Sequence, residues 1–429
     1  MKIGIIGSGH VGLVTGACFA HLGHEVLCVD NDPRKVALLK RGKSPIYEPG
    51  LEEMIAANLR EKRLFFTDQI TAAVRQAEVL FVCVWTPPKP NGEADLSAVE
   101  NVSRRIAHAL SSYRLIVDKS TVPVQTGEWV HRTIKASRRR NVEFDVASNP
   151  EFLREGSAVQ DFLEPDRVVI GVESKRAETL LRELYQPLKA PVLVTDIKSA
   201  ELIKHACNSF LAAKISFINL ISQICEAVGA DVEKVAEGMG LDPRIGRSFL
   251  SAGIGWGGSC FPKDLSAFIG IAEKLGVDAS LLRAVVEINQ RQCRHFVEKI
   301  RKHLWNLPGK TIGVWGLSFK PGTDDMRSAP SIEIINTLLE EGVRLRLYDP
   351  EAMPLARGVL KGGTFVKNAY EAARGADALL VLTEWPEFLE IDFKRVRKLM
   401  RHPLIFDGRN VYEPGKIKKL GFQYHGMGR

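Results

Sequence analysis

The stretch MKIGIIGSGHVGLVTGACFAHLGHEVLCVDND, residues Met1–Asp32, decides the fold of this chain. A continuous apolar run over Ile3–Ile6 predicts a strand that enters a glycine turn. Small and apolar residues over Val11–Leu22 predict a helix, and a second apolar strand, Glu25–Val29, ends at Asp30. The stretch therefore predicts a strand–helix–strand unit at the start of a doubly wound α/β sheet.

The glycine turn has a dinucleotide-binding pattern, because Gly7, Gly9 and Gly12 form G-x-G-x-x-G between a strand and a helix. Gly7 permits the tight turn, Gly9 lets backbone N–H groups approach a pyrophosphate, and Gly12 permits close packing of helix on strand. The dipole at the helix N-terminus favours the phosphate charge. A glycine turn without a ligand is the alternative interpretation, and the position of Asp30 argues against it.

Asp30 ends the second predicted strand. A carboxylate at this position accepts hydrogen bonds from ribose hydroxyls, which predicts NAD rather than the 2′-phosphorylated cofactor. The basic residues Arg34 and Lys35 lie nearby and weaken this preference.

The composition indicates a globular protein of two or three domains. The 429 residues are 45% hydrophobic and 26% charged, and a chain of this length exceeds what one core holds. The formal net charge of +8 suits a small anionic substrate, whereas nucleic acid would need a concentrated basic patch. The basic run Arg138–Arg140 follows a predicted helix and is interpreted as a solvated helix end. We therefore expect no nucleic-acid partner.

The seven cysteines have no paired spacing, which argues against a disulfide framework and a zinc cluster, and no metal site is expected. The first strand begins at Lys2 and leaves no room for a signal peptide. The longest apolar stretch, Ile215–Cys225, is too short and too polar to span a membrane. These features predict a cytoplasmic enzyme with reduced thiols and no membrane partner.

Further apolar runs predict a large first domain and a second domain like it. The runs AEVLFVCVWT, RLIVDKST and FDVASNPEF are continuous rather than alternating, as in a parallel sheet buried on both faces, and the first domain is expected over 1–196. Later, KTIGVWGLSF, RLRLYDP and AARGADALLVLTEW repeat this order, so a second Rossmann-like domain is expected over 308–429. It lacks the third glycine, and a loop that includes Lys320 and Arg327 precedes its first helix.

Residues 197–307 are expected to form a central helical domain. Residues 199–227 have the pattern of one long helix that is apolar over most of its circumference, which predicts that it is buried. A helical block between two α/β domains is a natural place for contact between subunits.

Cys260 stands out in the segment SAGIGWGGSCFPKD, Ser251–Asp264. Pro262 suits the first turn of a helix, so the thiol is expected at a helix N-terminus, where the dipole stabilises a thiolate. The four glycines before it let the loop wrap closely around a ligand. The other six cysteines are expected to be small buried side chains. Asp264 is either an acid that favours the helix start or a catalytic group.

NAD together with a nucleophilic thiol predicts an acid as the product. Oxidation of an alcohol to an aldehyde needs only a base and NAD, but an aldehyde yields a second hydride only after a nucleophile adds to its carbonyl. A thiolate would form a thiohemiacetal, the second oxidation would give a thioester, and water would hydrolyse it.

Polar residues in otherwise apolar segments complete the candidate site. Lys204 and Asn208 lie four apart on one helical face, where they could bind an oxyanion, although Lys204 could instead reach water. Thr121 follows a predicted strand, at the sheet edge where ligands bind. Glu151 and Glu155 follow another strand, and they are either a water-activating base and a cofactor contact or a salt-bridged surface pair.

Six segments resemble the UDP-glucose/GDP-mannose dehydrogenase family, which oxidises nucleotide-diphospho-sugars twice. They are GSGHVG, STVPVQTG, NPEFLREGSAVQDFLEPDRVVIG, AELIKHACNSFLAAKISFIN, GWGGSCFPKD and GLSFKPGTDDMRSAPS, in order over nearly the whole chain. The resemblance implies NAD-dependent, four-electron oxidation of UDP-glucose to UDP-glucuronate, with Cys260 as the nucleophile. It also implies a homodimer built on the central helices, in which Arg244 reaches the sugar site of the neighbouring subunit.

The resemblance implies a role for each matching residue. Asp264 and Lys204 would assist proton transfer and stabilise the oxyanion, and Asn208 would hold the reacting oxygen. Thr121 would position a water and touch the cofactor, and Glu151 would be the base in thioester hydrolysis. Besides the three glycines, the implied cofactor contacts are Val11, Asp30, Lys35, Thr86, Thr121, Glu155, Lys263 and Arg327. The implied substrate contacts are Glu151, Phe152, Leu153, Arg154, Lys204, Asn208, Arg244, Phe249, Leu250, Ser251, Ala252, Gly253, Gly257 and Lys320.

Within the family, the segments around Cys260 and Glu151 resemble the UDP-glucose branch. The histidine that the UDP-N-acetylhexosamine branch tends to carry beside the cysteine is absent. GDP-mannose is the first alternative substrate, and a UDP-N-acetylhexosamine is the other. A nucleotide-sugar-binding regulator without turnover is an alternative of a different class, against which the intact set of candidate catalytic residues argues. One departure from the family is Gln125, where relatives usually carry glycine, and it affects only local geometry near the cofactor loop.

Overall fold

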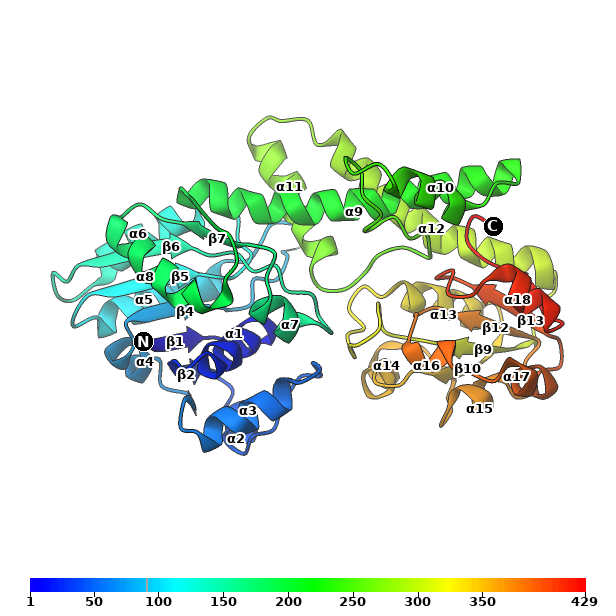
Figure 1. The fold of residues 1–429 in the computed structure, drawn as a ribbon, viewed down its shortest axis with the longest axis horizontal. Coiled ribbons are helices and arrows are strands. Elements are labelled where there is room, and N and C mark those ends of the chain that lie inside the picture. Colours follow the sequence, from blue (N-terminus) through cyan, green and yellow to red (C-terminus); the bar gives the residue numbers. More distant parts are fainter. Residues whose placement is uncertain (90–91) are drawn as a thin grey trace. The chain divides into compact units, whose positions relative to one another are not determined.

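The computed structural model describes residues 1–89 and 92–429 and contains two α/β parts and a set of long helices (Figure 1). Its tertiary contacts divide the chain into two compact units. The first comprises Met1–Cys207 with Ser266–Gly276, and the second comprises Asn208–Leu265 with Val277–Arg429.

The sheet of the first unit has eight described strands in the order β3-β2-β1-β4-β5-β6-β7-β8. The first six strands are parallel and have the strand order of a dinucleotide-binding domain. The runs from which a parallel sheet was predicted form β4, β5 and β6 and are parallel, whereas β7 and β8 run opposite to them because the chain does not cross back to the other end of the sheet after β6. The strands are β1 (Lys2–Ile6), β2 (Glu25–Val29), β3 (Leu64–Thr67), β4 (Val79–Val82), β5 (Arg114–Asp118), β6 (Phe144–Ser148), β7 (Val168–Gly171) and β8 (Val192–Thr195).

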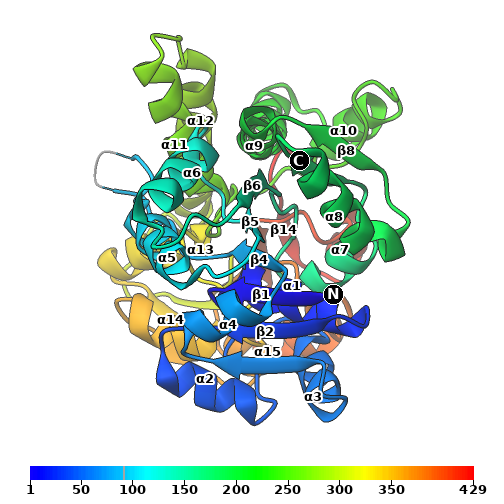
Figure 2. The same ribbon diagram turned by 90° about the vertical axis from the view of Figure 1, so that its left-hand side faces the viewer.

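Helices cover both faces of this sheet. Apolar side chains of α1, α3, α7 and α8 form the core on one face, and those of α4, α5 and α6 form the core on the other (Figure 2). Because both faces are covered, the strands are apolar throughout rather than alternating. The helices are α1 (His10–His21), α2 (Pro33–Lys40), α3 (Leu51–Arg60), α4 (Ile70–Gln76), α5 (Ser97–Ala109), α6 (Thr126–Ser137), α7 (Ala158–Leu163) and α8 (Lys175–Tyr185), followed by the 3₁₀ turn Gln186–Leu188.

The second unit contains a six-stranded parallel sheet within the described residues, in the order β11-β10-β9-β12-β13-β14. This is again the Rossmann strand order, which confirms the second Rossmann-like fold. The strands are β9 (Thr311–Trp315), β10 (Arg344–Tyr348), β11 (Thr364–Phe365), β12 (Ala378–Val381), β13 (Leu404–Asp407) and β14 (Gln423–His425). Its helices are α13 (Pro330–Glu340), α14 (Met353–Val359), α15 (Ala369–Ala373), α16 (Pro386–Leu389), α17 (Phe393–Leu399) and α18 (Pro414–Lys419).

The central helices are α9 (Ile197–Val228), α10 (Val232–Gly240), α11 (Phe261–Lys274) and α12 (Ser280–Leu304). The expectation that the long helix is buried is wrong for one side of α9, since Phe210, Phe217, Ile224 and Val228 are exposed. The opposite side packs within the protein, where Ile218 and Cys225 contribute to a small core. Because α9 is apolar over most of its circumference but packs on one side, an apolar stripe on its other side is exposed.

By length and composition alone, α9 could cross a membrane, because an 18-residue window has a mean hydropathy of 1.4 and is 33% buried. This finding corrects the expectation that no apolar stretch is long enough. Helices of soluble proteins meet the same criterion, and α9 carries polar side chains with partners inside the protein. Lys204 pairs with Glu151, His205 bonds the carbonyl of Val122, and Asn208 bonds Asp264.

Candidate active site

The glycine turn after β1 leaves open space at one position and none at the other two. Gly7 has φ of +100°, and a Cβ there would lie 2.6 Å from the carbonyl oxygen of Cys83. A Cβ on Gly12 would lie 1.9 Å from the carbonyl oxygen of Gly7, whereas one on Gly9 would meet no atom within 4 Å. Gly9 is also the N-cap of α1, with no side chain capping the helix. This open helix start fits the diphosphate of a dinucleotide.

Asp30, at the end of β2, accepts hydrogen bonds from the Ser8 amide at 3.0 Å and from Lys35 Nζ at 2.7 Å. Burial opposes the charge on Asp30, but the hydrogen bonds from Lys35 and from backbone amides outweigh it and lower the pKa of the carboxyl. Asp30 is therefore a carboxylate beside the turn, as recognition of a ribose requires. Lys35, which weakened the expected preference for NAD, is itself bound by Asp30.

Glu151 and Lys204 form a buried ion pair. Lys204 Nζ, on α9, lies 2.9 Å from Glu151 Oε1, on the segment after β6, and each side chain is 5% exposed. The second oxygen of Glu151 accepts from the Leu153 amide at 2.7 Å, and Lys204 Nζ lies 5.5 Å from the centre of the Phe152 ring. The structure therefore excludes both alternatives, because Lys204 does not extend to water and Glu151 is not part of a surface pair.

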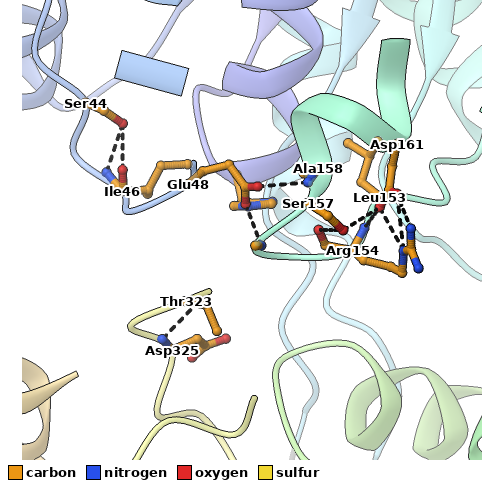
Figure 3. Close-up of polar contacts among 12 residues, drawn as sticks. Ser44, Ile46, Glu48, Leu153, Arg154, Ser157, Ala158, Asp161, Thr323 and Asp325 are labelled. Carbon is orange, nitrogen blue, oxygen red and sulfur yellow. Dashed lines mark hydrogen bonds and ion pairs between the residues drawn. The ribbon is translucent and has the colours of Figure 1, made fainter. Parts of the chain in front are cut away.

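The segment after Glu151 is held by carboxylates from other elements, as Figure 3 shows. Asp161 accepts from the amide of Arg154 at 2.8 Å and also pairs with its guanidinium. Glu48 accepts from the amides of Gly156 and Ala158, both at 2.8 Å. The conformation of the predicted substrate segment 151–154 and of Glu155 thus depends on contacts distant in sequence.

A second set of candidate residues lies at the start of α11, in the second unit. Cys260 immediately precedes the helix, its carbonyl accepts from the Asp264 amide at 2.8 Å, and its Sγ lies 3.6 Å from Ser259 Oγ. Asp264 is 1% exposed and accepts from Asn208 Nδ2 at 2.5 Å. Lys263 Nζ lies 3.0 Å from the other oxygen of Asp264, close enough for an ion pair but without hydrogen-bond geometry.

Asp264 lies in the first turn of α11, as expected for an acid that favours a helix start, and it also contacts Asn208 and Lys263, two other candidate residues. Cys260 is partly buried. Five other cysteines are buried, as expected, whereas Cys207 is partly buried. Burial raises the pKa of Cys18, Cys83 and Cys293 to about 12, so these three thiols stay protonated.

The glycines before Cys260 pack against protein rather than around an open space. A Cβ on Gly257 would lie 2.2 Å from the Ser328 carbonyl oxygen, and one on Gly253 would lie 2.8 Å from the carbonyl oxygen of Gly408. Arg409 donates to the carbonyl of Gly255 at 2.9 Å. Close approach of the chain itself therefore also requires glycine at Gly253 and Gly257.

The remaining candidates are distributed over both units. Thr86 is buried and donates to the carbonyl of Thr121 at 3.0 Å, so these two cofactor candidates are joined. In the second unit, Arg327 pairs with Asp325 at 2.7 Å, and its carbonyl accepts from the Gly258 amide at 2.9 Å. Arg244 is 88% exposed in its side chain, and Phe249 has φ of +65°.

Lys119 and Asn149, which the sequence motifs did not identify, border the same cavity as Glu151. Lys119, after β5, donates to Asn149 Oδ1 at 2.9 Å, and Tyr185 donates to the same oxygen at 2.5 Å. Burial lowers the pKa of Lys119 to about 8, opposed by the nearby Cys83 and Glu151. A cavity of about 40 Å³ borders Lys119, Asn149 and Glu151. Lys119 and Asn149 each follow the end of a strand, and this position could have identified them. Glu48, which was also missed, lies in a loop where no sequence pattern marks it.

Comparisons with known proteins agree over the full chain. Sequence profiles of the UDP-glucose/GDP-mannose dehydrogenase family match in three parts: the NAD binding domain at residues 1–189, the central domain at 198–291 and the UDP binding domain at 313–414. UDP-glucose 6-dehydrogenase TuaD of Bacillus subtilis (strain 168) is 47% identical over 100% of this chain and 93% of its own length. UDP-glucose 6-dehydrogenase of Rhizobium meliloti (strain 1021) is 46% identical over 100% of both chains.

Among solved structures, a UDP-glucose dehydrogenase from the hyperthermophilic archaeon Pyrobaculum islandicum superposes with a TM-score of 0.93. It is 40% identical in sequence, over 100% of this chain and 97% of its own. The resemblance inferred from the sequence motifs is thus confirmed, and this chain belongs to the UDP-glucose/GDP-mannose dehydrogenase family.

Proposed function

We propose that the protein oxidises UDP-glucose to UDP-glucuronate in two NAD-dependent steps. The overall change converts a primary alcohol, water and two NAD into a carboxylate, two NADH and three protons. The observation that carries the proposal is the thiol of Cys260 directly before α11, one turn from the buried Asn208–Asp264 contact. The full-length similarity to UDP-glucose 6-dehydrogenases supports the substrate.

The fit of the glycine turn and Asp30 to a dinucleotide supports NAD as the cofactor. When bound, NAD accepts one hydride from the sugar carbon in each oxidation. Besides Gly7, Gly9, Gly12 and Asp30, we assign the cofactor contacts to Val11, Lys35, Thr86, Thr121, Glu155, Lys263 and Arg327.

The catalytic residues divide the work between proton transfer and covalent chemistry. Lys204 and Asp264 move the proton released from the hydroxyl and stabilise the oxyanion, while Asn208 holds the reacting oxygen. The Cys260 thiolate adds to the aldehyde carbonyl and forms the C–S bond of a thiohemiacetal, which the second oxidation converts to a thioester.

Hydrolysis of the thioester needs an activated water. Glu151 accepts a proton from a water that Thr121 positions, the hydroxide adds to the carbonyl, and the sulfur of Cys260 leaves as a thiolate. The remaining substrate contacts proposed are Phe152, Leu153, Arg154, Arg244, Phe249, Leu250, Ser251, Ala252, Gly253, Gly257 and Lys320.

Stoichiometry tests the two-step reaction. We expect two NADH for each UDP-glucose consumed, and release of an aldehyde with one NADH would contradict the proposal. Cys260→Ser should abolish net turnover, whereas Cys207→Ser, at the other partly buried cysteine, should retain it. A panel of UDP-glucose, GDP-mannose and UDP-N-acetyl sugars tests the substrate, and no activity with any of them would favour a binding regulator.

The exposed stripe of α9 supports a homodimer. Phe210 is 67% exposed, Phe217 47%, Ile224 50% and Val228 71%, and their spacing places them along one face of the helix. Two copies that pair through this stripe would remove it from water. Arg244 would then reach the sugar site of the partner subunit. Phe217→Glu should convert the dimer to a monomer in sedimentation experiments, and a wild-type monomer would contradict the pairing.

We propose three domains within the chain: an NAD-binding domain at 1–196, a helical dimerisation domain at 197–307 and a UDP-sugar-binding domain at 308–429. The central profile match begins at residue 198 and supports the first boundary. All seven cysteines are free thiols, which supports the cytoplasm as the location, because reducing compartments keep thiols free.

A further inference from the structure

Glu48 is a fully buried carboxylate with three partners from distant segments. It lies between α2 and α3, and its side chain is 0% exposed. Its oxygens accept from the amides of Gly156 and Ala158, both at 2.8 Å, and contact His10 Nε2 at 2.7 Å. Figure 3 shows Glu48 directed toward the backbone at Ala158. A buried carboxylate is retained only where its oxygens are satisfied, so these partners hold it in one place.

The partners of Glu48 belong to two functional segments. His10 is the first residue of α1 and follows Gly9 of the glycine turn. Gly156 and Ala158 follow Glu151 and Glu155, and Gly156 has φ of +84°. One carboxylate thus joins the turn proposed to hold the cofactor to the segment that carries the proposed base.

The charges around His10 favour its protonated form. Burial opposes the charge, but the hydrogen bond to Glu48 and the negative charges of Glu155, Glu48 and Glu151 outweigh it and raise the pKa of His10. On α1, the thiol of Cys18 also faces Glu48, and burial together with that carboxylate raises its pKa to about 12. His10 therefore titrates beside Glu48 while the thiol stays neutral.

We propose that Glu48 is a positioning residue for the reaction, which fixes the Glu151–Glu155 segment relative to the glycine turn through its contacts with His10, Gly156 and Ala158. The inference rests on the proposed function for its catalytic consequence, but the structural link can be measured without turnover. The hydrogen bonds of Glu48 go to His10, Gly156 and Ala158 rather than to the residues that we assign to catalysis. Glu48 therefore acts through the positions of Glu151 and Glu155.

The first test uses Glu48→Gln, which keeps the size of the side chain but can no longer accept from both amides. In the ligand-free protein, hydrogen exchange of peptides that cover 151–160 should accelerate at least about tenfold, because two amides lose a charged acceptor. The affinity for NAD in calorimetry should fall, and kcat/KM should fall about 100-fold, since small displacements of catalytic groups have effects of that size.

Glu52→Gln is the matched control. Glu52 lies on the same part of the chain and also accepts from a backbone amide, that of Ser44 at 3.0 Å, but its side chain is 42% exposed and pairs with Lys43. This variant should leave exchange at 151–160 and kcat/KM unchanged. Unchanged exchange in Glu48→Gln, or equal effects in both variants, would overturn the proposal. If Glu48→Gln does not fold, Glu48→Asp, which keeps the charge but is too short to reach both amides, replaces it with the same expected result.

A pH profile separates positioning from a merely structural role. As the pH rises through the raised pKa of His10, which lies above the usual 6.5, the wild-type protein should lose NAD affinity because His10 loses its positive charge beside Glu48. His10→Gln keeps a hydrogen bond to Glu48 without the charge, and its NAD affinity should vary less with pH. An identical pH dependence in both proteins would overturn the role of His10. If exchange responds but no substrate is turned over, the proposed function fails while the structural link remains.

Discussion

Lys204 Nζ lies 2.9 Å from Glu151 Oε1, and both side chains are almost completely buried. The two residues come from different elements, the long helix α9 and the segment after β6. In a buried pair, each charge compensates the desolvation of the other, so removal of one partner leaves an uncompensated charge. The pair therefore couples the stability of the first unit to the residues proposed for catalysis.

Glu151→Gln should destabilise the protein by about 3 kcal/mol, because it removes the negative charge that lies 2.9 Å from the buried Lys204 ammonium. Urea unfolding followed by tryptophan fluorescence measures this loss. The double variant Glu151→Gln with Lys204→Met should recover most of it. Glu237→Gln, which removes an exposed ion pair with Lys234, should not change the midpoint. Equal stability of the single and double variants would contradict the assignment.

Asp30→Ala should shift the cofactor preference from NAD toward its 2′-phosphorylated form. The variant loses the acceptor for the ribose and releases Lys35, whose Nζ Asp30 now holds at 2.7 Å. We expect kcat/KM for NAD, relative to kcat/KM for the 2′-phosphorylated cofactor, to fall by about 100-fold. The loss of one charged hydrogen bond to the ribose and the gain of a contact with the phosphate together account for a change of this size. Asp32→Asn is the control, since Asp32 caps α2 through the amides of Arg34 and Lys35 and should not alter the ratio.

Gln125→Gly should stabilise the first unit. Gln125 has φ of +80°, a left-handed conformation that costs a residue with a side chain about 1 to 2 kcal/mol. Glycine adopts it freely and keeps the amide that donates to Glu201 at 2.7 Å, although it adds about 0.5 to 1 kcal/mol of entropy to the unfolded chain. The net gain should be up to about 1 kcal/mol in the free energy of unfolding. Gln125→Ala retains the strain and should show no such gain.

Glu226 should make the second unit sensitive to acid. It accepts from His295 at 2.8 Å, from the Gly428 amide at 2.7 Å and from Lys299. Burial opposes its charge, but these hydrogen bonds outweigh it and lower the pKa of Glu226 from 4.5 to about 2. A carboxyl with a lowered pKa contributes stability above its unfolded pKa and loses it as the pH falls toward its folded pKa.

The wild-type protein should therefore be more stable than Glu226→Gln by about 2 to 3 kcal/mol near pH 7, and the difference should vanish between about pH 4.5 and pH 2. Unfolding midpoints over this pH range measure it. Glu413→Gln, at an exposed pair with Lys416, serves as the control and should follow the wild-type curve. A difference that is constant with pH would contradict the ionic origin of the effect.

The linear sequence determined those features that depend on local chemistry. The apolar period and glycine spacing of Met1–Asp32 predicted both ends of β1, α1 and β2 to within one residue, because strand, turn and helix there follow from neighbouring residues. The order of apolar runs predicted the second Rossmann-like fold. Pro262 predicted the helix start after Cys260, since proline is accommodated in the first helical turn.

Only the tertiary structure decided which polar groups meet. Whether Lys204 reaches water or pairs with Glu151 depends on how α9 packs on the segment after β6, which no local pattern specifies. The same holds for Glu48 and Ala158, which are joined across 110 positions of the chain, and for the glycines before Cys260, which accommodate the backbone of the protein itself. Local sequence sets backbone conformation, whereas the partners of buried charges are set by packing between distant segments, since burial is what makes those partners necessary.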